Sequence, residues 1–149
     1  MYKRQVAIPS YSRYVVKTKV SSGVMTIDQA KDAVVDAFLS GGIAAVNSLS
    51  NDWAASWEGQ NYLDDVSIEP GTGIITVTFD DSAIPAIAGA NQMTVAPWVS
   101  GGELTDGAQG AIEWACVSSG NRNASAEGYG ATEAPANPID IAYAPYGCD

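Results

Sequence analysis

A helical pattern of apolar residues over positions 10–39 limits the folds open to this chain more than any other feature. At 100° per residue, seven apolar side chains fall within roughly 100° of arc, which is wide enough to cover a core. They are Val16, Val20, Val24, Ile27, Val34, Val35 and Phe38. The pattern predicts a long amphipathic helix over residues 6–40, with Gly41-Gly42 as its stop.

A second apolar group lies on about the opposite side of the same helix, roughly 170° from the stripe. It comprises Ile8, Tyr11, Tyr14 and Val15. Such a helix would bury one face in its own domain and turn the other to a different partner. A break at residues 21–23 is the competing reading, with Thr26 opening a second helix. The unbroken helix is favoured.

Beyond residue 62 the apolar period changes from helical to alternating. DVSIEPGTGIITVTF (65–79) predicts two strands around a Pro-Gly-Thr-Gly turn. QMTVAPWV (92–99) and AIEWACVSS (111–119) predict two more. We therefore expect a single α+β domain in which the long N-terminal helix packs across a four-stranded antiparallel sheet.

Residues 43–62 predict a long connection containing a short helix. Trp53 and Trp57 are four residues apart and would share one face of it. They would either clamp the connection onto the core or form an exposed contact for a partner or a glycan. The clamp is favoured.

Charge and histidine content argue against several functions. Seventeen acidic residues against seven basic ones leave a net charge of −10, which repels nucleic acid from most of the surface. The helix turns Arg13 and Lys17 away from Lys19, a poor arrangement for tracking phosphates. Histidine is absent, and with it the commonest general base and transition-metal ligand. We therefore expect that the chain is not an enzyme and that it has no cofactor and no metal site.

Other polar motifs have ordinary structural interpretations. The paired acids Asp64-Asp65 and Asp80-Asp81 lack the interleaved oxygen ligands of a calcium loop and flank strands, where solvated acids are common. Asn123 begins the only Asn-x-Ser/Thr sequon in the chain, which matters only in a host that glycosylates it.

The two cysteines, Cys116 and Cys148, are either buried thiols or one disulfide. A disulfide is favoured because Cys148 is next to last and a chain end usually needs tying down. It would also hold the irregular last thirty residues. A disulfide implies an oxidising compartment outside the cytoplasm, whereas the sequence shows no export signal, and these two inferences conflict. Either the cysteines are free, therefore, or the native N-terminus is missing.

The order of these elements resembles the type IV pilins, the major subunits of bacterial type IV pili. The similar segments are AIPSYSRY (7–14), KVSSGV (19–24), ITVTFDDSAIPAIAG (75–89), MTVAP (93–97), IEWAC (112–116) and YAPYGC (143–148). The resemblance runs from about residue 6 to the end of the chain. It implies the pilin fold, with residues 41–149 as a globular head and a C-terminal loop closed by the disulfide.

The resemblance also implies a structural function. The chain would be a subunit of an extracellular filament used for adhesion, twitching motility or DNA uptake. Its partners would be copies of itself, the pilus assembly machinery, and host or abiotic surfaces. The subunit interface would be formed by Ile8, Pro9, Tyr11, Tyr14 and Val15.

The front of the chain departs from the family pattern. Type IV pilins begin with a basic leader and an apolar run that contains an early Glu, so residues 1–5 (MYKRQ) are expected to be non-native. The full-length form would be an inner-membrane precursor. Two alternatives remain open. One is a pseudopilin or minor pilin of a type II secretion system, and the other is a secreted carbohydrate-binding module that uses its tryptophans.

Overall fold

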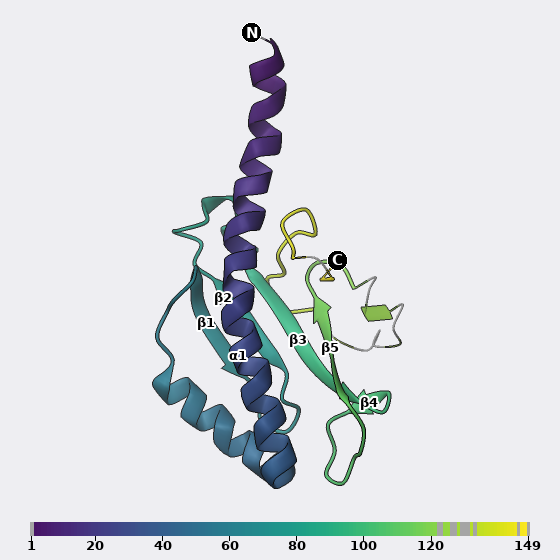
Figure 1. Ribbon diagram of the computed structural model, residues 1–149. Coiled ribbons are helices and arrows are strands. Elements are labelled where there is room, and N and C mark those ends of the chain that lie inside the picture. The colour runs from purple at the N-terminus through teal and green to yellow at the C-terminus, as the bar shows by residue number, and fades with distance from the viewer. Residues whose placement is uncertain are drawn as a thin grey trace.

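The computed structural model describes residues 2–121, 124–125, 128, 132, 134–145 and 147–148, with side chains from Tyr11 onward. A long helix, α1 (Tyr2–Ser56), precedes all the strands (Figure 1). The strands are β1 (Leu63–Ile68), β2 (Ile75–Phe79), β3 (Gln92–Val99), β4 (Gly102–Glu103) and β5 (Ile112–Val117), with a short 3-10 helix, η1 (Pro85–Ile87), between β2 and β3. The N-terminal part of α1 projects well beyond the sheet (Figure 1). The predicted α+β architecture is confirmed.

Helix α1 continues without a break through residues 21–23, so the single-helix prediction is correct. Gly23 is buried where the helix meets the sheet. A Cβ at this position would lie 2.9 Å from Leu63 Cδ2 and 3.0 Å from Phe79 Cε1. The glycine therefore lets α1 approach β1 and β2 closely. Thr26 does not cap a second helix, because it is buried and its hydroxyl accepts a hydrogen bond from the Asn61 amide at 2.7 Å.

The predicted stop at Gly41-Gly42 is a kink. Gly42 is non-helical, with φ 66° and ψ −152°, a conformation that glycine adopts without steric cost. A second helical segment then runs to Ser56, so a break at Gly41-Gly42 is present as predicted, but the connection expected after it is helical for most of its length and contains more than a short helix. The carboxylate of Asp106, from the loop after β4, accepts the Ile43 N–H at 2.8 Å. Asp106 thus caps the second helical segment from a distant part of the chain.

The strands form one antiparallel sheet. β2 lies between β1 and β3, and β3 pairs with β5 along the other edge. The two-residue strand β4 was not predicted, and it pairs with the end of β3 that lies beyond β2. Ser100 and Gly101 join β3 to β4 with φ values of 51° and 78°, as a tight hairpin turn requires.

Pro97 lies inside β3, a central strand in which proline is normally disfavoured because it lacks an N–H. Pairing with β2 reaches only Val95, and pairing with β4 begins at Trp98. Backbone groups of alternate residues point to opposite sides of an antiparallel strand. The backbone nitrogen of Pro97 therefore faces the gap between β2 and β4. No described strand pairs with β3 in this gap, so the missing N–H costs the sheet no hydrogen bond.

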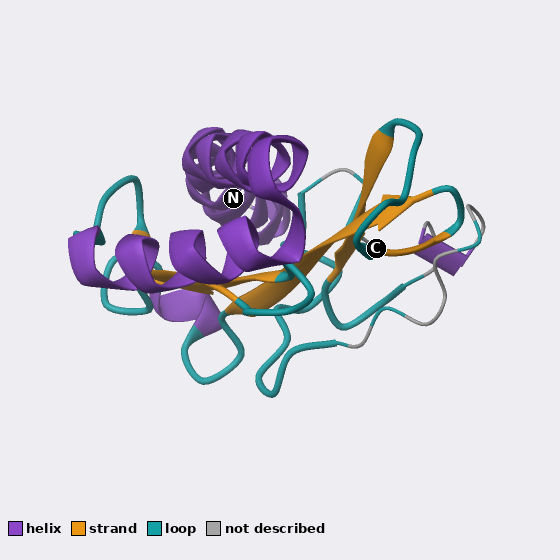
Figure 2. Ribbon diagram, turned by 90° about the horizontal axis from the view of Figure 1, so that it is seen from below, coloured by secondary structure: helices purple, strands orange, loops and turns teal. Residues whose placement is uncertain are grey.

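One face of the sheet is covered by α1, and the other face is covered at β3 and β5, whereas β1 leaves its outer residues exposed. The main core lies between α1 and the sheet (Figure 2) and contains Val16, Val20, Ile27, Val34, Phe38, Val66, Ile75, Val77, Phe79, Met93 and Val95. A second cluster on the other face contains Ala96, Trp98, Ala115, Val117 and Ala124. β3 is buried on both faces, which explains why its sequence is almost continuously apolar.

The helical stripe is confirmed as the core-facing side of α1. Five of its seven residues are buried, and Val24 and Val35 are half-buried. By length and composition alone, residues 11–56 would also be apolar enough to cross a membrane, a property that the core helix of a soluble domain shares.

Candidate functional site on the exposed face of the long helix

From Tyr11 onward, four large apolar side chains are exposed on α1, three of them in its N-terminal half and the fourth, Leu39, further along and 73% exposed. Tyr11 and Tyr14 are each 68% exposed and Met25 is 72% exposed. At 100° per residue they fall within roughly 60° of arc, and the centre of that arc is roughly 150° from the buried stripe. We call Tyr11, Tyr14 and Met25 the open face. It is an apolar surface that the domain itself leaves uncovered.

The open face contains part of the predicted subunit interface. Tyr11 and Tyr14 lie on the surface, and Val15 is half-buried at its margin. The side chains of Ile8 and Pro9 are outside the described residues. Met25 was missed, although it lies eleven residues after Tyr14 and therefore only about 20° from it on the helix.

A shallow hollow lies on this face between Tyr14 and Met25. Its volume is about 480 Å³, and its remaining walls are Lys17, Thr18, Ser21 and Ser22. The side chains of the threonine and the serines are short, so the larger side chains around them protrude further from the helix. A partner's apolar side chain could fill this depression.

Two lysines of α1 contact residues of the globular domain. Lys19 Nζ donates to the Ala83 carbonyl at 3.2 Å and lies 5.8 Å from the centre of the Tyr62 ring. Lys31 Nζ lies 5.9 Å from the centre of the Trp114 ring. Such contacts hold the two cations against the domain. They do not extend the exposed Arg13 and Lys17 into a continuous basic track.

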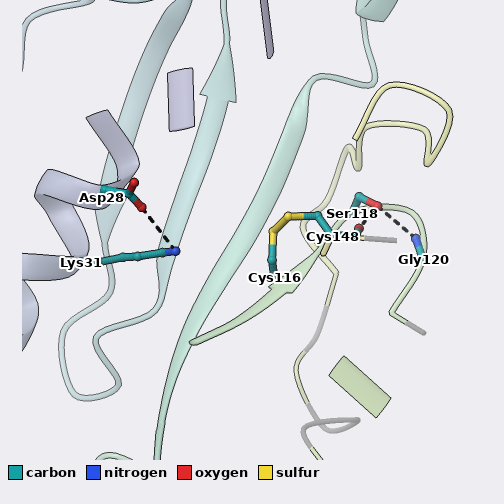
Figure 3. The surroundings of a disulfide bond; sticks show 6 residues. All are labelled: Asp28, Lys31, Cys116, Ser118, Gly120 and Cys148. Carbon is teal, nitrogen blue, oxygen red and sulfur yellow. Dashed lines mark hydrogen bonds and ion pairs between the residues drawn. A yellow bond between two sulfur atoms is a disulfide. The ribbon is translucent and has the colours of Figure 1, made fainter. Parts of the chain in front are cut away.

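The C-terminal loop is closed by a disulfide between Cys116 and Cys148, as predicted (Figure 3). The Ser118 hydroxyl donates to the Cys148 carbonyl and accepts the Gly120 N–H (Figure 3). These bonds attach the chain end to the residues that follow β5. The Asn123 sequon lies outside the described residues.

Backbone hydrogen bonds hold the same loop further upstream. The N–H of Ile139 donates to the Gln92 carbonyl at 2.7 Å, and the N–H of Ser119 donates to the Ile139 carbonyl at 2.9 Å. The Ile139 side chain is fully buried. The loop is therefore anchored to the start of β3 and the end of β5 as well as by the disulfide.

Trp53 and Trp57 lie on the second segment of α1 and stack on each other, with ring centres 6.2 Å apart and planes 18° apart. The Trp53 indole N–H donates to the Val66 carbonyl at 3.0 Å, and that of Trp57 donates to the Asp64 carbonyl at 3.2 Å. Both rings are half-buried against the main core. The geometry favours the clamp, while an exposed contact role for these rings stays a prediction.

The paired acids have separate surroundings. Asp80 Oδ1 accepts the backbone N–H groups of Ser82 and Ala83 at 3.0 and 3.3 Å, and also the Ser82 hydroxyl. These bonds, chiefly the one from the hydroxyl, lower the pKa of Asp80, which fits a carboxylate that stabilises the turn after β2. Within the described part of the chain, no group of three Cys, Asp or Glu residues could hold a metal ion.

A long helix across an antiparallel sheet, a disulfide-closed C-terminal loop and an apolar helix face left open are together the features of a pilin. The model of the Pilin family (bacterial filament) matches residues 16–149, and the chain belongs to this family. The crystal structure of a type IV pilin from Pseudomonas aeruginosa strain Pa110594 is similar, with a TM-score of 0.76. The two sequences are 26% identical, and the match covers 90% of this chain and 97% of that one. No curated protein sequence matches the chain.

The family and the structural match support a type IV pilin, the structural subunit of a bacterial filament. Pilins are not enzymes. The alternative of a free carbohydrate-binding module does not fit this family.

Proposed function

We propose that this pilin assembles with copies of itself into an extracellular type IV pilus, and that the open face of α1 packs against helices of neighbouring subunits. The main support for this proposal is that α1 has apolar side chains on two opposite faces. One face is buried in the domain's own core, whereas Tyr11 and Tyr14 each leave 68% of their surface exposed. Large exposed apolar groups that lie close together mark an interaction surface.

This surface would form part of a larger subunit contact, because a stable interface buries about 800 Å² on each partner. A tyrosine can bury about 150–250 Å², so each exposed ring offers about 100–170 Å². At about 25 cal/mol per Å², complete burial would contribute at most about 2.5–4 kcal/mol per ring. The contact repeats at every subunit of a filament, and its effect accumulates along it. Ile8, Pro9 and Val15 extend the same interface in this proposal.

We further propose that the disulfide-closed loop lies on the outer surface of the filament, where it would meet host or abiotic surfaces. Adhesion and twitching motility are then the favoured filament activities. The net charge of −10 makes direct DNA capture by the head unfavourable. The full-length form would be inserted in the inner membrane and assembled by the pilus machinery.

Filament formation tests the proposal most directly. Tyr11→Ser and Tyr14→Ser would be introduced together into the chromosomal gene of the source bacterium, and sheared filaments would be measured by immunoblot and electron microscopy. We expect filaments to fall at least about tenfold, because burial of both rings is lost. The total amount of oxidised pilin should stay unchanged.

Ile141→Ser is the matched control. It removes an apolar side chain that is 50% exposed on the C-terminal loop, far from the open face in the sequence. This control should leave the filament yield at the wild-type level. Wild-type yield from the double tyrosine variant would refute the assembly role of the open face.

A further inference from the structure

Strand β1 forms one edge of the sheet and has only β2 beside it. Along an antiparallel edge strand, alternate residues turn their backbone N–H and C=O groups away from the sheet. Val66 and Ile68 belong to this outward set, and the carbonyl of Asp64, at a bulge between Leu63 and Asp65, also points outward, because all three carbonyls accept hydrogen bonds from α1. A row of unpaired groups at such an edge is a template for another strand.

All three outward carbonyls of β1 accept a side-chain donor from the second segment of α1. The Ser50 hydroxyl donates to Ile68, the Trp53 indole to Val66 and the Trp57 indole to Asp64. The donors are three and four residues apart, so they share one helix face, and the acceptors are two residues apart. Seven helical residues rise about 10 Å and four strand residues about 13 Å, so side chains of ordinary length can match the two spacings.

We propose that Ser50, Trp53 and Trp57 act as an edge cover that closes β1 against strand addition by a second copy of this chain. Subunits of a filament meet at very high local concentration, and an open sheet edge would then compete with the helix face for self-association. Asp64 and Asp65 are exposed on the same strand. They add like-charge repulsion to any pairing of β1 with β1. The inference goes beyond filament assembly, because it identifies a surface that must not associate.

The choice of side chains supports closure over simple packing. Burying a ring against the core needs no indole nitrogen, and phenylalanine would serve. Here both tryptophans turn their N–H groups to successive outward carbonyls, and Ser50, only 9% exposed, completes the row. The second segment of α1 turns back alongside the sheet after the kink (Figure 1), which brings this row of donors to β1.

The test compares Ser50→Ala/Trp53→Phe/Trp57→Phe with the unchanged chain by sedimentation velocity over a concentration series. We expect the triple variant to associate at concentrations lower by about tenfold or more, because three capped carbonyls become free for pairing. Hydrogen exchange supplies a local measurement. The outward amides of Val66 and Ile68 should gain protection as concentration rises, because an added strand would accept their hydrogen bonds.

Trp98→Phe is the matched control. The Trp98 indole donates to the Thr132 hydroxyl at 3.1 Å in the interior, so this variant loses a similar hydrogen bond without opening an edge. It should lose stability and remain at the wild-type association state. If the triple variant does not fold, Ser50→Ala alone removes one donor, leaves both rings in place and should show a smaller increase in association. Variants that associate no more than the unchanged chain, with no concentration-dependent protection at β1, would overturn the proposal.

Discussion

Gly23 provides a test in which local propensity and tertiary packing predict opposite signs. Replacing glycine with alanine inside a helix normally stabilises it by about 1 kcal/mol. In this fold the new methyl group would meet Leu63 Cδ2 at 2.9 Å, Phe79 Cε1 at 3.0 Å and the Asn61 carbonyl oxygen at 3.3 Å. Leu63 and Phe79 are only 2% and 0% exposed, so neither can move aside without disturbing the core.

Overpacking of this kind costs about 1–3 kcal/mol. With the distance to a backbone oxygen also short, we place the cost near the upper end of that range. After subtraction of the propensity gain, Gly23→Ala should lower the free energy of unfolding by about 1–2 kcal/mol. For a domain of this length, that corresponds to a decrease in Tm of roughly 2–8 °C.

Urea unfolding of the oxidised protein measures the change, provided that the m-value stays constant. Ser21→Ala is the matched control, because Ser21 is exposed on the same helical turn, and it should change stability by no more than about 0.5 kcal/mol. Gly23→Ala should also cost less in a Leu63→Val background, which removes one of the clashing methyl groups. A stabilising Gly23→Ala would refute the close approach of α1 to the sheet at this position.

Two further outcomes follow from capping carboxylates. Asp106→Ala should lower the free energy of unfolding by about 1 kcal/mol, because the Ile43 N–H loses its cap, whereas Asp106→Asn retains an acceptor and should cost less. Urea unfolding checks both variants. The pKa of Asp80 is lowered from its ordinary value of 3.8, so its stabilising effect is complete above that value and is lost as pH falls through the folded-state pKa. Asp80→Asn should therefore flatten the dependence of stability on pH below about pH 4, as thermal unfolding at several pH values would show.

The elements that the sequence predicted well are those with a local signal. The stripe from Val16 to Phe38 and the alternation of Ile75, Val77 and Phe79 each record which face is buried. β3 was also predicted over residues 92–99, although it contains a proline. Pro97 is tolerated because its backbone nitrogen faces the gap between the end of β2 and the start of β4. The position of that gap could not be predicted from the residues of β3 alone.

The features that sequence reasoning missed depend on contacts between distant residues. Gly42 has the composition of a helix stop, and it becomes a kink because Asp106, more than sixty residues later, caps the next segment. Ser50 gave no signal at all, since a serine in a helix is commonplace and its acceptor, Ile68, belongs to another element. The pattern at Trp53 and Trp57 indicated a shared face but could not show which backbone atoms the indoles would meet.

The kink at Gly42 separates two different tasks of one helix. Before it, α1 buries one side in its own core and leaves the open face exposed. After it, the helix uses Ser50, Trp53 and Trp57 to occupy the outward carbonyls of β1. A straight helix of this length would carry its second segment away from β1, since each residue adds about 1.5 Å along a single axis. The bend at Gly42, held by Asp106, therefore lets the same helix leave the open face exposed before the kink and reach the outward carbonyls of β1 after it.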